Sequence, residues 1–323
     1  MSHWELRKRY KLKVLETPVP MQDVEKLQSI VYPGPETEVV PAHMLLAAIY
    51  NGGFLIGAYD KQLQDEAKIN TQEHEERPAT KPHLVGFVFG FPGIYRTPDG
   101  PRLKHSSHML AVHPDYRDQG IGFALKRAQW QMVRRQGIDR ITWTYDPLLS
   151  KNAYINIDRL GATCNTYMRE AYGEMRDGLN AGDLSDRFMV DWWVDSRRVS
   201  TRLSSQARAH LDLAHFLSAE TSILNPTRIG EDSLPYPSDV NDLTDRLIEN
   251  TFHQDHPIVM VEIPSNLPQI KRQNPELVPK WRLQTRSLFE TLFHSGYLIT
   301  DFIHLAGEMP RSFYVLSHGE ATL

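Results

Sequence analysis

The stretch Ser107–Gln136 reads SHMLAVHPDYRDQGIGFALKRAQWQMVRRQ and decides the fold that we expect for this chain. Its apolar run Met109–Val112 predicts a strand, and the apolar spacing after Gly122 predicts an amphipathic helix. Between them lies the segment RDQGIG, residues 117–122. Glycines let a ligand approach the backbone, and the free N–H groups at a helix start attract phosphate oxygens. The stretch therefore predicts a binding site for an anionic cofactor.

Two other phosphate-binding motifs do not fit this loop. A P-loop needs Gly-Lys-Ser/Thr at the start of the helix, but Phe123 and Ala124 follow Gly122. A dinucleotide fingerprint needs a third glycine where this sequence has Leu125. An ordinary glycine-containing turn without a ligand is the remaining alternative.

The pattern Arg-x-x-Gly-x-Gly at 117–122, preceded by Val-x-Pro at 112–114, resembles the acyl-CoA-binding motif of the GNAT superfamily of N-acetyltransferases. This resemblance implies an α/β fold with a mixed sheet and helices on both of its faces. The expected order of elements agrees, so we expect a GNAT acyltransferase domain at 1–195. A further α/β region is expected at 196–323, either as an extension of the sheet or as a degenerate second GNAT-like half.

Bulk composition favours a soluble protein of the cytoplasm. The chain has 36 Lys and Arg against 40 Asp and Glu, a formal net charge of -4, so charge gives no reason to expect nucleic acid or an acidic membrane as partner. Its single cysteine, Cys164, fits a reducing compartment. The N-terminal sequence lacks the apolar core of a signal peptide, and no apolar run reaches the length of a membrane span.

The resemblance also assigns residues to the coenzyme. Backbone groups of the strand would pair with the pantetheine arm, and the amide of Leu110 or Ala111 would lie closest to the thioester oxygen. The loop would hold the diphosphate, while Lys126 or Arg127 would reach a phosphate or be solvated charges. The full predicted set is Leu110, Ala111, Val112, Arg117, Asp118, Gln119, Gly120, Ile121, Gly122 and, on the next helix, Asn152.

A general base is harder to assign, because the glutamate that many GNAT members place on this strand is absent. Period-two alternation puts Ser106 and His108 on the side-chain face of Leu110. His108 is our candidate base, since a histidine titrates near neutral pH. A hydrogen-bonded core histidine, a water relay through Ser106, and deprotonation of the amine before binding are the alternatives.

The usual general acid, a tyrosine four residues before a closing glycine, is replaced by Ile157. Tyr154 and Tyr167 are the candidate substitutes, and a packing role is the alternative for each. For the substrate we expect Asp146 to bind an ammonium group or to cap a helix, with Asn156 beside the site. Arg187, and after it Arg311, would hold a carboxylate or form structural ion pairs.

Together these features predict an acyl-CoA-dependent N-acyltransferase. The chain resembles a long GNAT subgroup with relatives that transfer succinyl to amino acids, so acetyl-CoA and succinyl-CoA are both candidate donors. A small-molecule amine or amino acid is the expected acceptor, a homodimer is left open, and no metal is expected, because His253 and His256 fit a turn. A non-catalytic CoA-binding module and a scaffold without ligand are the rival functions.

Overall fold

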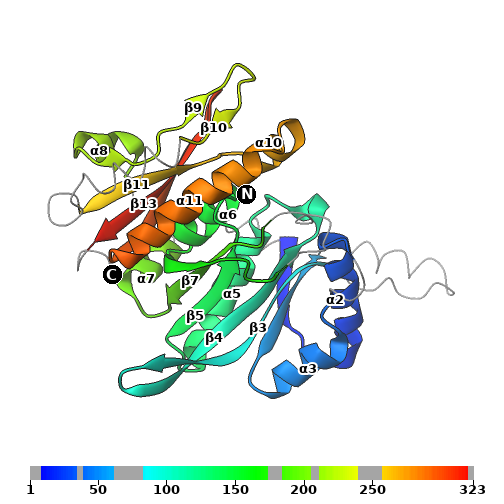
Figure 1. The fold of residues 1–323 in the computed structure, drawn as a ribbon. Coiled ribbons are helices and arrows are strands. Elements are labelled where there is room, and N and C mark those ends of the chain that lie inside the picture. Colours follow the sequence, from blue (N-terminus) through cyan, green and yellow to red (C-terminus); the bar gives the residue numbers. More distant parts are fainter. Residues whose placement is uncertain are drawn as a thin grey trace. The chain divides into compact units, whose positions relative to one another are not determined.

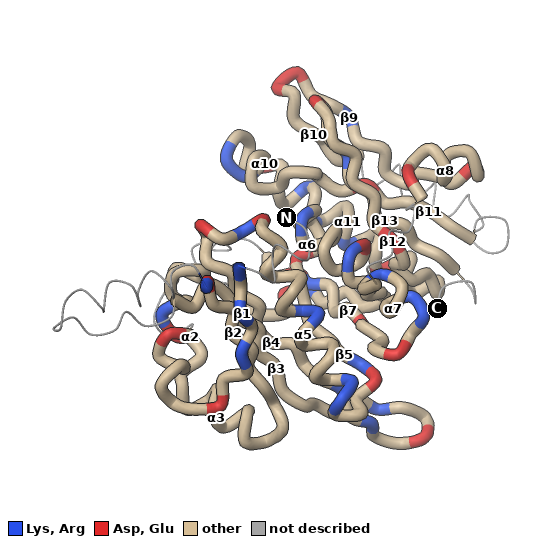
Figure 2. The backbone as a smooth tube through the Cα atoms, turned by 180° about the vertical axis from the view of Figure 1, so that it is seen from behind, with Lys and Arg blue, Asp and Glu red and all other residues tan. Residues whose placement is uncertain are grey.

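The computed structural model describes residues 9–34, 39–61, 83–173, 184–204, 211–238 and 257–318. These residues fall into two compact units, one up to Ile141 and the other from Thr142 onward (Figure 1). The boundary that we expected near residue 196 is therefore not where the contacts divide the chain. Basic and acidic positions are mixed in both units (Figure 2).

The first unit contains an antiparallel meander whose strands pair in chain order. Its strands are β1 (Tyr10–Val14), β2 (Phe54–Asp60), β3 (Leu84–Thr97) and β4 (Gly100–Val112). The last two form a long hairpin in which Leu110 lies opposite Val88, and the register shifts between Phe89 and Gly90. The sequence predicts strands at 84–91 and 103–112, and both are longer because residues 92–97 and 100–102 continue the pairing.

Helices cover both faces of this meander. On one face lie α2 (Pro18–Val31) and α3 (Ala42–Tyr50), whose apolar residues form a core with Phe87, Phe89 and Ala111 (Figure 1). The other face carries α5 (Ile121–Arg135), since a Cβ placed on Gly86 would meet side chains of that helix. The sequence predicts this helix at 21–31, and α2 begins three residues earlier because a proline fits its first turn.

The second unit contains a sheet in the order β5-β7-β6-β12-β13-β11-β8. These strands are β5 (Arg140–Tyr145), most of which lies in this unit, β6 (Thr163–Met168), β7 (Arg187–Trp193), β8 (Ser222–Ile223), β11 (Ile258–Ile263), β12 (Tyr297–Leu305) and β13 (Arg311–His318). Ile299 of β12 pairs with Cys164 of β6, so the C-terminal strands continue the sheet begun by the earlier ones.

The helices of this unit are α6 (Ser150–Ala153), α7 (Arg197–Leu203), α8 (Leu213–Ser218), α10 (Leu267–Gln273) and α11 (Leu277–His294), with a small hairpin of β9 (Arg228–Ile229) and β10 (Pro235–Tyr236). The sequence predicted one helix from Ser150 to Leu160. Instead, α6 is followed by a π-helical turn, Tyr154–Arg159, closed by the bond from Leu160 N–H to the Ile155 carbonyl at 2.9 Å. The sequence does not predict α7, because the Arg- and Ser-rich stretch at 196–205 is more typical of a domain boundary.

The connectivity of the second unit repeats itself. In the first half the chain runs β5, helix, β6, β7, and β7 lies between the other two strands. In the second half it runs β11, helices, β12, β13, and β13 again lies between the other two. This repeat favours a degenerate second half over a simple extension, although no glycine-rich loop follows β8.

Candidate functional site

The hydrogen-bond pattern of β4 determines which of its backbone groups are directed away from β3. The His113 N–H donates to the Val85 carbonyl at 2.9 Å. Because hydrogen-bonded and non-bonded pairs alternate in an antiparallel ladder, Ala111 is bonded to β3 while Leu110 and Val112 are not. The N–H and C=O groups of Leu110 and Val112 therefore face the opposite edge of β4.

Two side chains of the first unit confirm this orientation. The Tyr32 hydroxyl donates to the Leu110 carbonyl at 2.9 Å, and the Arg117 Nε donates to the Val112 carbonyl at 3.3 Å. Arg117, the charged residue of the predicted motif, thus ties the loop to the strand that precedes it. Between the two amides proposed for the thioester oxygen, the geometry favours Leu110, since that of Ala111 is committed to β3.

A bulge in β4 changes the position of the candidate base. The register shift lets His108 and Met109 both face α2 and α3, where the His108 ring contacts Phe89 and Phe91 at 6.0 and 5.8 Å between ring centroids. Leu110 lies on the opposite face, against Gly122 of α5. The expectation that His108 and Leu110 share a face is therefore wrong, because simple alternation does not continue through a bulge. Partial burial lowers the pKa of His108.

The loop between β4 and α5 has the backbone conformation that an anion site requires. Gly120 is the N-cap of α5 with φ of 84°, and Asp118 also has a positive φ, 63°. No side chain caps the helix, and its first turn carries no acidic residue. The Gln119 side chain accepts a bond from the Tyr10 hydroxyl at 2.5 Å, which fixes the loop to β1.

These features fit the diphosphate of a coenzyme. The first N–H groups of α5, from Ile121 on, have no partner within the helix, and the helix dipole favours an anion there. A Cβ at Gly122 would lie 3.8 Å from the Leu110 side chain and 3.9 Å from that of Val112, which is ordinary contact. The structure thus requires glycine for its conformation at position 120 but tolerates alanine at 122.

Lys126 does not reach toward a phosphate as one expectation had it. Its side chain is buried between α5 and β4, where the ammonium donates to the Ser107 hydroxyl at 2.9 Å and to Gln129 Oε1 at 3.0 Å. Burial holds the pKa of Lys126 well below its usual value. His105 completes the cluster at 3.2 Å from Gln129, and burial, followed by the charge of Lys126, lowers the pKa of His105 to about 3.

We predict that Lys126→Met stabilises the protein at neutral pH. Because the lysine pKa is lower in the folded than in the unfolded state, the unfolded chain binds more protons between the lowered pKa and the ordinary value of 10.5, and stability rises with pH through that window. Removing the amine eliminates this penalty, while Ser107 keeps its bond to Gln129 at 3.0 Å. Urea unfolding should show a gain of about 0.5–2 kcal/mol at pH 7 and a weaker dependence on pH. A lower stability at pH 7 would contradict the prediction.

In the second unit, the helix after β5 presents three of the predicted residues. Asn152 lies in α6, and Tyr154 begins the π-helical turn with 39% of its surface exposed. The buried Asn156 accepts a bond from Trp143 Nε1 at 3.2 Å, so its carbonyl oxygen is already used within the unit. Ile157, at the place of the family tyrosine, is fully buried.

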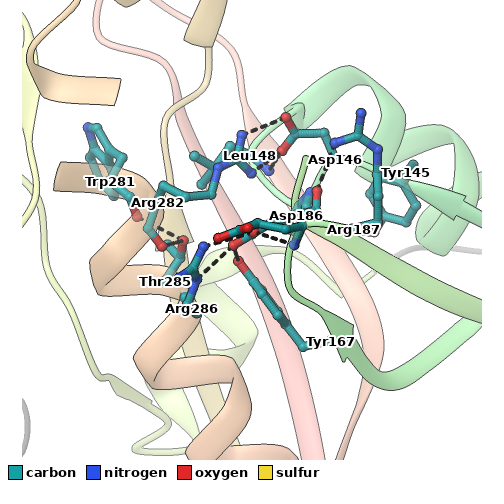
Figure 3. Close-up of polar contacts among 12 residues, drawn as sticks. Tyr145, Asp146, Leu148, Tyr167, Asp186, Arg187, Trp281, Arg282, Thr285 and Arg286 are labelled. Atoms are coloured by element: carbon teal, nitrogen blue, oxygen red, sulfur yellow. Dashed lines mark hydrogen bonds and ion pairs between the residues drawn. The ribbon is translucent and has the colours of Figure 1, made fainter. Parts of the chain in front are cut away.

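Tyr167 belongs to a buried charge network. Its hydroxyl donates to Asp186 at 2.7 Å, and Arg286 donates to both oxygens of the same carboxylate at 2.8 and 2.9 Å (Figure 3). Burial, and then the bond to Asp186, raises the pKa of Tyr167 well above its usual value. The phenol therefore holds its proton tightly, which gives little support to a role as general acid.

The predicted substrate-binding residues of the second unit also form hydrogen bonds within that unit. Both oxygens of Asp146 accept bonds from Arg282, at 2.5 and 2.7 Å, and Oδ1 also accepts the Leu148 N–H at 2.9 Å (Figure 3). Arg187 donates to the Asp186 carbonyl at 2.8 Å and is buried. Arg311 forms a two-bond ion pair with Glu262 at 2.7 Å. These contacts support the structural alternative for Arg311. Asp146 forms a buried ion pair and does not cap α6, whose N-cap is Leu149 without a side-chain hydrogen bond.

Comparison with known families identifies the segment that carries the glycine loop. Residues 46–154 match the model of the acetyltransferase (GNAT) family. This chain contains a GNAT acetyltransferase domain. The match runs from the second half of α3 to the end of α6 and includes β4, the loop and α5. The GNAT resemblance that the sequence predicted is thus confirmed.

Solved structures show distant similarity. The NatC complex bound to Gag peptide and CoA is 16% identical with a TM-score of 0.41, covering 57% of this chain and 98% of that chain. The ribosomal-protein-S18-alanine N-acetyltransferase from Escherichia coli is 13% identical with a TM-score of 0.39, covering 62% and 98%. NAA60 from Arabidopsis thaliana with a bisubstrate analogue is 13% identical with a TM-score of 0.39, covering 57% and 99%. No curated protein sequence matches the chain.

Two features of the first unit could not be predicted from the sequence. The contact of Tyr32 with Leu110 joins residues 78 positions apart, and the bulge at His108 depends on pairing with β3. Neither leaves a local signal. Across the described ranges, no cluster of three metal-ligating side chains occurs, and none of the helices there has the length and apolar content of a membrane span. His253 and His256 lie outside the described residues.

Proposed function

We propose that this protein is an acyl-CoA-dependent N-acyltransferase that acylates a small-molecule amine or amino acid. The observation that carries the proposal is the arrangement of β4 and its loop within the GNAT domain. The backbone groups of Leu110 and Val112 face away from β3, and two residues with positive φ, Asp118 and Gly120, lead into an uncapped helix. The edge of β4 and the start of α5, which follow one another in the chain, are therefore both available to bind the same ligand.

Each part of this arrangement has a chemical task. When bound, acyl-CoA supplies an acyl group activated as a thioester. Leu110 and Val112 would pair with its pantetheine arm, with the Leu110 N–H available to the carbonyl oxygen on which negative charge develops. The first amides of α5, Ile121 and Gly122, would hold the diphosphate. Asn152 remains our proposed additional contact with the arm. Direct attack by a neutral amine then needs only a proton acceptor and a donor for the thiolate.

Turnover assays test the proposal directly. Acetyl-CoA and succinyl-CoA are each incubated with a panel of primary amines and amino acids, and the released thiol is measured with the acylated product. Calorimetry with CoA runs in parallel. We expect tight binding and amine-dependent thiol release. Binding without product for any amine would favour the rival function, a non-catalytic CoA-binding module, which the buried Ile157 at the family tyrosine position supports.

The base role of His108 predicts a specific pH profile. Because partial burial lowers the pKa of His108, the neutral imidazole persists to lower pH than it would in solution. The acid limb of kcat/KM should therefore lie below pH 6.5, the ordinary histidine value. His108→Gln should abolish this limb and lower kcat about 100-fold, the usual scale for loss of a general base. An unchanged profile in the variant would show that another group accepts the proton.

A further inference from the structure

Tyr32 contacts the backbone of the residue on which the proposed function depends. It is the C-cap of α2, where its N–H donates to the Gln28 carbonyl at 2.8 Å. Its ring packs against the apolar core formed by α2, α3 and the sheet. From this anchored position the hydroxyl donates to the Leu110 carbonyl at 2.9 Å. The backbone and the hydroxyl of Tyr32 are thus both fixed by hydrogen bonds within the first unit.

The position of this hydroxyl follows from the direction of the Leu110 backbone. The Leu110 carbonyl faces away from β3, as does the N–H of the same residue. Hence the hydroxyl of Tyr32 lies at the edge of β4 to which we assign the thioester. Of the two phenols that the sequence suggests, Tyr167 is bonded to a buried carboxylate, and Tyr154 is 39% exposed at the start of the π-helical turn.

We propose that Tyr32 is the general acid that protonates the departing thiolate. This inference rests on the proposed function and gives that site a proton donor. As the amine attacks, the new C–N bond forms and the C–S bond breaks, leaving the electron pair on sulfur. The Tyr32 O–H transfers its proton to that sulfur, and the nitrogen that becomes the amide releases its proton to the general base. The base returns this proton to solvent, and the phenolate takes one back from solvent. The net change is amine plus thioester to amide plus thiol.

Ordinary acidities permit this transfer. A phenol has a pKa of about 10 and an alkyl thiol about 8.5, so the two groups lie within about two units. A general acid close in pKa to its acceptor acts efficiently in the transition state. The bond to the Leu110 carbonyl also orients the hydroxyl in advance, because the same proton that would be transferred already points to this edge of β4.

The experiment compares Tyr32→Phe with the wild type and with Tyr59→Phe. Tyr59 is a buried tyrosine of β2 in the same core, so its variant removes a hydroxyl from the same unit without touching β4. For the amine that wild type acylates fastest with acetyl-CoA, we expect Tyr32→Phe to lower kcat about 100-fold. The dissociation constant of CoA by calorimetry should stay within about threefold, and Tyr59→Phe should behave as wild type.

The pH dependence separates proton donation from a structural role. In wild type kcat should fall at alkaline pH as the phenol ionises, and this fall should be missing in Tyr32→Phe. A variant with wild-type kcat, or one whose loss is entirely in CoA binding, would overturn the assignment of Tyr32 while leaving the proposed function intact. A wild type that binds CoA but acylates no amine would overturn the proposed function, and this inference with it.

Discussion

Replacing Gly120 by glutamate should raise the dissociation constant of CoA at least about 100-fold. Gly120 has φ of 84°, a left-handed conformation that costs an L-residue about 1–2 kcal/mol. The side chain would also add a negative charge beside the first amides of α5. Loss of two charge-assisted bonds to a phosphate, each about 1.5–3 kcal/mol, accounts for the expected factor, since 1.4 kcal/mol is tenfold. Calorimetry with CoA measures it.

Gly137 offers a matched control at the other end of the same helix. It has φ of 70°, and no atom lies within 4 Å of the position of an added Cβ. Gly137→Glu therefore introduces the same conformational strain and the same charge, and should leave CoA affinity within about threefold. Gly122→Ala should also bind CoA nearly as wild type, because its Cβ meets only ordinary contacts. Equal losses at positions 120 and 137 would show that the loop does not bind the coenzyme.

The elements around the candidate site that the sequence predicted correctly depend on local patterns. Glycine spacing, the proline after the strand and the apolar period of the helix all act within about 30 residues of chain. These signals predicted the carboxyl-terminal part of β4, the loop and α5 (Ile121–Arg135) where the structure has them. The family match over 46–154 confirms the same segment.

The parts that were missed depend on the partners of each residue. The helical position of Lys126 predicts a solvent-exposed side chain. The side chain is buried instead, because Ser107 and Gln129 provide hydrogen-bond acceptors for its amine. His108 does not lie on the side-chain face of Leu110 as expected, because β4 has a bulge where it pairs with β3. Asp146 appeared suited to an ammonium substrate, and only the fold reveals Arg282, 136 residues away, on its carboxylate. Such pairings have no local pattern.

Breaking the Arg282–Asp146 pair by a single substitution should be among the most destabilising changes in the second unit. Both side chains are buried, with 2% and 8% exposed, and they share two hydrogen bonds (Figure 3). Arg282→Met leaves the Asp146 carboxylate buried without its cation, which typically costs about 3–5 kcal/mol. Urea unfolding followed by circular dichroism should show this loss as a lower midpoint with an unchanged slope.

An exposed pair of the same geometry tests whether burial is the cause. Arg169 also donates two bonds to one carboxylate, that of Glu290, but 61% of its side chain is exposed. Arg169→Met should leave the midpoint nearly unchanged, because water solvates the freed carboxylate. The double variant Arg282→Met with Asp146→Leu should recover most of the stability lost in the single one, since it removes the unpaired charge as well. Failure of the double variant to recover would mean that the Leu148 bond to Asp146, and not the ion pair, stabilises this turn.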